Sequence, residues 1–120
     1  MTTSIQYSDA EMTRSEQMSA ALALGHILKL PLPPASWIIS RYNAPWLSAS
    51  ITASSDEKTL HHLAQWAVFL RAEIKAIDHT PGHVAVVVAG DYRGVRMDVS
   101  AIVAASARLP RPAMTNGAAA

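Results

Sequence analysis

Hydrophobic residues between Ser54 and Ile77 recur at steps of three and four, and this spacing predicts a helix. Ser54 followed by Glu57 has the spacing of a capping box, which satisfies free amide groups where a helix begins. A helix with one apolar stripe must bury that stripe, so we expect the rest of the chain to cover it. The stripe consists of Leu60, Leu63, Ala67, Leu70, Ile74 and Ile77.

A second apolar segment, residues 18–29, predicts the back half of an N-terminal helix that begins at Asp9 or Thr13. Three prolines at positions 31, 33 and 34 end it. A helix that is apolar on all sides is usually buried on more than one side, and in a chain of this size another subunit could supply the second cover. The apolar residues around this helix are Met18, Ala21, Leu22, Leu24, Ile27 and Leu28.

Four segments have the composition or the alternation of strands: residues 36–42, 46–53, 83–90 and 95–103. Turn residues at 43–45 and 91–94 join them into two hairpins, whereas residues 78–82 read as a loop. Ile102 breaks the alternation of the last strand. The fold class predicted is α+β, in the order α-β-β-α-β-β, with a four-stranded, mostly antiparallel sheet packed on the central helix. We expect a flexible N-terminus at 1–8, a single domain at 9–103 and a disordered tail at 104–120.

Composition narrows the functional classes. The 120 residues are 50% hydrophobic and 16% charged, which suits one folded domain, and the low aromatic content of 6% predicts a modest core. The absence of cysteine excludes disulfides, thiol catalysis and cysteine zinc sites, and it fits a cytoplasmic protein. The apolar run of residues 18–30 is too short for a membrane span, and the segment before it is too acidic for a secretion signal.

Candidate catalytic and metal-binding residues are few. His61 and His62 are adjacent and diverge on a helix, and His79 and His83 are separated by a Pro-Gly turn, so we predict no metal site and no cofactor. No nucleophile elbow or glycine-rich phosphate loop occurs, and an enzyme is not expected. A deep pocket that brought together His62, Glu73 or Asp98 would favour catalysis instead. The charged hairpin residues Asp91, Asp98, Arg93 and Arg96 are expected to form cross-strand pairs on a solvent face.

Three segments resemble a group of small α+β proteins of uncharacterised function from actinobacteria and their phages or mobile elements. They are the proline-flanked strand at Trp37, the helix segment 66–70 and the hairpin segment 91–95. The resemblance covers residues 34–103. It implies neither an activity nor any functional residue for this chain.

Protein association is the function that these observations favour. Trp37, Trp46 and Trp66 are many tryptophans for so small a domain, and tryptophan is enriched at binding hot spots, although all three could instead fill the core. We expect a homodimer, since two-fold dimers are the commonest oligomers, and binding to another protein, with no membrane involved. The predicted interface residues are Leu24, Leu28, Trp37 and Trp46.

The alternative is a regulator that binds nucleic acid through a sheet face bearing arginine and aromatic residues. Its candidate residues are Arg41, Arg93 and Arg96. The net charge of +1 and the scattered basic residues weigh against this alternative.

Overall fold

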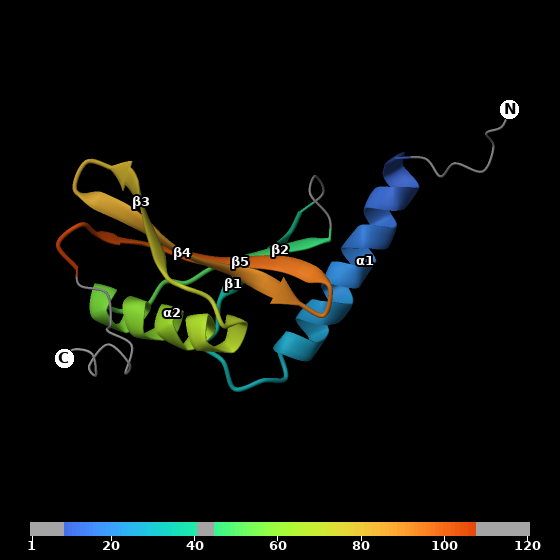
Figure 1. Ribbon diagram of the computed structural model, residues 1–120, viewed down its shortest axis with the longest axis horizontal. Coiled ribbons are helices and arrows are strands. Elements are labelled where there is room, and N and C mark those ends of the chain that lie inside the picture. The colour runs from blue at the N-terminus through green and yellow to red at the C-terminus, as the bar shows by residue number, and fades with distance from the viewer. Residues whose placement is uncertain (1–8, 41–44, 108–120) are drawn as a thin grey trace, which may run out of the picture.

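The computed structural model describes residues 9–40 and 45–107, which form two helices and a five-stranded sheet (Figure 1). The α+β class predicted from the sequence is therefore confirmed. Arg41 and the tail from residue 108 lie outside the described residues. In chain order the elements are α1 (Asp9–Ile27), β1 (Ser36–Ile39), β2 (Trp46–Ser50), α2 (Asp56–Leu70), β3 (Lys75–Thr80), β4 (His83–Tyr92) and β5 (Val95–Ala104).

The sheet has one strand more than predicted and is mixed. Its spatial order is β1-β2-β5-β4-β3, and the pairings within β1-β2, β3-β4 and β4-β5 are antiparallel. The hairpin β1-β2 and the three antiparallel strands β3, β4 and β5 are joined by a parallel pairing of β2 with β5, in which Leu47 lies opposite Met97. Hairpin spacing in the sequence fixes only neighbouring strands, so it could not show which strand would lie beside β2. The central strand of the sheet is β5, and the apolar strand β4 lies between β5 and β3.

The extra strand arises because α2 ends seven residues earlier than predicted. Arg71 adopts a left-handed conformation with φ 54° and ψ 48°, and its amide donates to the Val68 carbonyl. The amide of Ala72 donates to the Ala67 carbonyl at 3.0 Å, which completes the helix end. The chain then forms β3, so Ile77 belongs to a strand rather than to the helix stripe.

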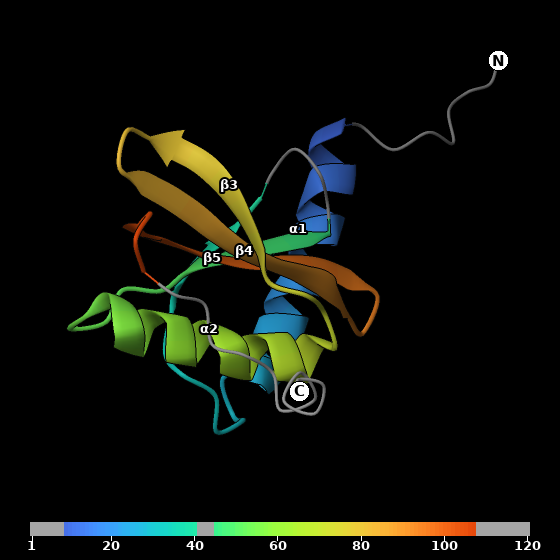
Figure 2. The same ribbon diagram turned by 60° about the vertical axis from the view of Figure 1, so that its left-hand side comes forward.

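Both helices pack on the same face of the sheet. α2 contacts β4 and β5, whereas α1 contacts β1, β2 and β5. Figure 1 shows the C-terminal end of α1 on the α2 side of the sheet, and its N-terminal end extending past the sheet, as the rotated view in Figure 2 confirms. Within the described residues, the two helices thus cover one face of the sheet and neither packs on the other.

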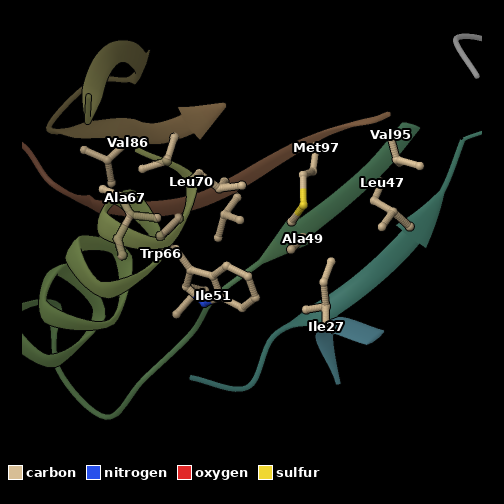
Figure 3. Packing of buried hydrophobic residues seen from close by; sticks show 14 of the residues in the cluster. Ile27, Leu47, Ala49, Ile51, Trp66, Ala67, Leu70, Val86, Val95 and Met97 are labelled. Atoms are coloured by element: carbon tan, nitrogen blue, oxygen red, sulfur yellow. The ribbon is translucent and has the colours of Figure 1, made fainter. Parts of the chain in front are cut away.

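The core is one continuous cluster between the covered face and the helices. Trp66 of α2 is its largest fully buried side chain, and the Trp66 indole donates to the Pro33 carbonyl at 3.2 Å. Ile27 of α1 lies at the end of the cluster near Leu47 and Val95 (Figure 3). The predicted stripe of α2 is buried as far as Leu70.

Candidate interaction surfaces

The sheet face opposite the helices is described by strand register, because side chains along a strand alternate between faces. Val95, Met97 and Val99 of β5 point into the core, so Arg96 and Asp98 point the other way. We call this second side the open face. Its aligned rows are Trp46–Arg96–Asp91, Ile38–Ser48–Asp98–Ala89, Ser36–Ser50–Ser100–Val87–Lys75 and Ile102–Ala85–Ile77.

Three isoleucines are exposed on the open face. Ile38 of β1 is 67% exposed, Ile77 of β3 is 57% exposed and Ile102 of β5 is 50% exposed. The residues aligned between them are mostly alanine and serine, so the middle of the face carries short side chains. A surface with exposed isoleucines and mostly short side chains between them offers contact area to a partner.

A hydrogen-bonded group holds Trp46 in place on the open face. The indole Nε1 of Trp46 donates to Oδ2 of Asp98 at 2.6 Å, and Oγ of Ser48 donates to the same oxygen at 3.1 Å. The guanidinium of Arg96 lies 5.9 Å from the centre of the Trp46 ring. Bonds to a carboxylate are stronger than bonds between neutral groups, so Asp98 fixes the orientation of Trp46. The ring is half-buried and keeps one part open to a partner.

The second surface is the outer side of α1. Met18 and Leu22 are 61% and 64% exposed and lie on the side of α1 opposite its buried residues. Leu28, in the turn that follows α1, is 65% exposed. Ala21 and Gly25 lie between them and are also exposed. An additional Cβ at Gly25 would meet no atom within 4 Å, so the space above this glycine is open. We call Met18, Ala21, Leu22, Gly25 and Leu28 the α1 stripe.

The four predicted interface residues fall into two pairs. Leu28 lies on the α1 stripe and Trp46 on the open face. Leu24 is half-buried and packs against the core. Trp37 points to the covered face, where its ring meets that of Trp66 edge-on at 5.5 Å. Leu24 and Trp37 therefore contribute to the fold of the monomer.

The candidate nucleic-acid residues do not come together. Arg93, in the turn between β4 and β5, contacts His26 Nε2 at 3.4 Å and bonds to the Tyr92 hydroxyl, on the helix side of the sheet. Arg96 lies on the open face, opposite Asp91 in the register. Within the described chain, these two arginines therefore lie on opposite sides of the sheet, although the hypothesis required them on one face.

The candidate enzyme residues are also spread over the fold. His62 is on α2 and Asp98 is on the open face, so the whole sheet separates them. An open hollow of about 440 Å³ at the start of α2 does contain Asp56 and His61. Asp56 Oδ2 there accepts a hydrogen bond from the Ala104 amide at 3.0 Å, which ties α2 to the end of β5. Among residues 9–40 and 45–107, no three histidine or acidic side chains are close enough to hold a metal ion.

Sequence reasoning missed the three exposed isoleucines as a group. The hydrophobic spacing predicts Ile77 on the helix stripe, but Ile77 lies in β3. Ile38 belongs to a strand of four residues, too short for its pattern to show which face each side chain occupies. Ile102 gave the one usable signal, since it breaks the alternation of β5 at a position that should be polar. The exposed apolar side of α1 could be predicted, because the apolar residues in the sequence of this helix fall on all of its sides.

Comparisons of the chain with protein-family models, with curated proteins and with solved structures found no match. Neither α1 nor α2, the two helices of the described part, is long and apolar enough to cross a membrane. The two apolar surfaces and their geometry are therefore the basis for a functional proposal.

Proposed function

We propose that the protein acts by binding other protein chains, as a homodimer with a separate partner-binding surface, and that it has no catalytic centre. The open face around Trp46 binds the partner. The resemblance to small proteins of actinobacteria and their phages or mobile elements suggests the context, an accessory or regulatory protein working in the cytoplasm.

One observation carries this proposal. Eight large hydrophobic side chains in the described chain are at least half exposed, and six of them belong to the open face or to the α1 stripe. Large apolar side chains that gather on one surface of a soluble protein mark places where proteins associate. The other two are Met12 and Val68.

The open face also has the mixture of groups that recognises protein surfaces. Trp46 is a large ring held rigid by Asp98, and a rigid aromatic loses little entropy on binding. Arg96 beside it presents charge-assisted donors for carboxylate or carbonyl groups of a partner. Ile38, in the row next to Trp46, and Ile102, further along β5, supply apolar contact on the same face.

The test is capture of partners from extracts of the native host by the immobilised full chain. Proteins bound by the wild type should be lost with Ile102→Asp, because a charge placed in the interface would be desolvated without a partner. The matched control is Val68→Asp on the outer side of α2, which is 78% exposed and belongs to neither surface. Both variants should unfold at the wild-type temperature to within a few degrees, since both replace exposed side chains.

Two outcomes would contradict the proposal. The first is an identical set of captured proteins for Ile102→Asp and Val68→Asp. The second is binding of a single-stranded oligonucleotide at low salt that weakens with rising salt and disappears in Arg96→Ala, which would assign the open face to nucleic acid.

A further inference from the structure

We infer that the α1 stripe binds the α1 stripe of a second copy of this chain, with the two helices antiparallel. This inference rests on the homodimer of the proposed function and specifies its interface. The open face then remains free on both subunits for the partner.

The composition of the stripe fits a copy of itself. Large residues, Met18 and Leu22, alternate with the small residues Ala21 and Gly25 along one line of the helix. When two such helices are placed side by side in opposite directions, the large side chains of one meet the small positions of the other. The open space above Gly25 is where a side chain of the second copy would enter. Close approach of helices requires small residues at the contact, which this stripe supplies.

Charge decides the direction of pairing. The line of the α1 stripe continues through Arg14 to Glu11 near the start of the helix, and it reaches Lys29 just past the end of the helix. All three residues are exposed. An antiparallel pair opposes the two helix dipoles and places none of these charged residues beside its own copy. A parallel pair would place Glu11 beside Glu11 and Lys29 beside Lys29, which is unfavourable.

The location of α1 leaves room for the second copy. The buried residues of this helix, Ala20, Ala23 and Ile27, face the sheet, and the stripe is on the opposite side. The N-terminal end of α1 extends past the sheet in both views (Figures 1 and 2), so the described strands do not block a second helix along it.

Size sets the strength of this dimer. α1 has 19 residues and is about 28 Å long at 1.5 Å per residue. One helix pair of that length buries less than about 1,200 Å² in total, the range of weak and transient interfaces. The dimer should therefore exchange with monomer at micromolar concentrations.

Sedimentation of the full chain over a wide concentration range provides the first test. The wild type and Val68→Asp should show the same monomer–dimer equilibrium, whereas Leu22→Asp should raise the dissociation constant at least about tenfold, because each dimer buries two unpaired charges. Gly25→Gln fills the open space with a polar side chain and should also weaken the dimer. The same substitution should leave the monomer as stable or more stable, since glycine inside a helix is unfavourable by up to about 1 kcal/mol.

Disulfide cross-linking tests the direction, since the chain has no cysteine of its own. Ala21→Cys lies near the two-fold axis of an antiparallel pair and should give a covalent dimer under mild oxidation. Glu11→Cys should not, because its two copies would be about 27 Å apart along the helix axis. Cross-linking of both variants with equal yield would indicate a parallel pair and would overturn the inference.

The remaining outcomes separate this inference from the proposed function. A strict monomer at high micromolar concentration would overturn the homodimer itself. A dimer that survives Leu22→Asp but dissociates in Ile38→Asp would keep the homodimer and would move its interface to the open face. In that case the α1 pairing is wrong.

Discussion

The two helices lie on the same face of the sheet but place their hydrophobic residues in opposite ways. α2 directs its bulky residues into the core, and Val68 is the large aliphatic side chain that it leaves exposed. α1 buries two alanines and one isoleucine, whereas Met18, Leu22 and Leu28 are exposed. The two helices thus contribute differently to the fold. α2 supplies most of the bulky helical side chains of the core, whereas α1 adds modest burial and has an exposed apolar side.

This difference has an energetic consequence. Apolar burial stabilises a fold by roughly 25 cal/mol per Å² of surface removed from water, so an alanine contributes much less than a tryptophan or a leucine. The covered side of the sheet near α2 also contains a row of aromatic contacts. Rings of Trp37, Trp66, Phe69 and Tyr92 meet in sequence, with centroid distances of 5.5, 5.9 and 5.2 Å. Substitutions should therefore cost most in α2.

Trp66→Ala should have the largest effect on the fold. It removes a ring that is 1% exposed, its bond to the Pro33 carbonyl and two aromatic contacts. We expect a loss of about 3–5 kcal/mol in the free energy of unfolding, and some of the protein could unfold at 37 °C. Urea denaturation followed by circular dichroism measures this loss. A loss below about 1 kcal/mol would show that α2 is not the main support of the core.

Ile27→Ala compared with Leu28→Ala tests the two sides of α1 at adjacent positions. Ile27 is 2% exposed and Leu28 is 65% exposed. The first substitution should cost about 2–4 kcal/mol at any protein concentration, because it leaves a cavity in the core. The second should cost under about 0.5 kcal/mol in dilute protein, with a larger effect only where the dimer forms. Thermal unfolding at two widely spaced concentrations measures both. Equal losses for the two variants would contradict the assignment of opposite sides.

The helices also differ in how much of each could be predicted from the sequence. α1 ends at Ile27, close to the predicted end, and Pro31 shortly afterwards is a visible stop. α2 ends at Leu70 although Arg71, Ala72 and Glu73 are all compatible with a helix. The helix end coincides with a tertiary contact, since the C-terminal end of α2 packs against β4 and a Cβ on Gly90 would lie 3.3 Å from the Leu70 Cβ and carbonyl oxygen. Local propensity cannot report such a contact.

The candidate surfaces also differ in how far local sequence pattern could predict them. The apolar surroundings of α1 indicated an exposed or shared side directly, because a periodic pattern records how many sides of a helix are apolar. The open face depended on register between strands far apart in the chain, such as Trp46 opposite Arg96, and on the unpredicted strand that carries Ile77. Trp37 and Trp46 have similar sequence contexts but point to opposite faces of the sheet, which only the pairing of β1 with β2 decides.

Ser55→Ala compared with Ser54→Ala locates the start of α2. The sequence predicted Ser54 as the cap, but Ser55 is the residue whose side chain accepts from the Lys58 amide at 3.1 Å. Loss of this acceptor should cost about 1 kcal/mol, and the Ser54 substitution should cost only a few tenths. The difference in unfolding free energy between the two variants is the measurement. A larger loss for Ser54→Ala would restore the predicted capping box.

Arg71→Gly addresses the other end of α2, with the smallest effect and the opposite sign. Arg71 has φ 54°, a conformation that costs an L-residue about 1 kcal/mol or more and costs glycine almost nothing. Glycine also loses more entropy on folding, so the net gain in stability should be about 0.5 kcal/mol. Ala72→Gly is the control, since Ala72 does not have a positive φ and should lose stability. Chemical denaturation of both variants measures the two shifts. If Arg71→Gly also lost stability, the end of α2 would not depend on the left-handed residue, and the packing of Leu70 against Gly90 would be its main cause.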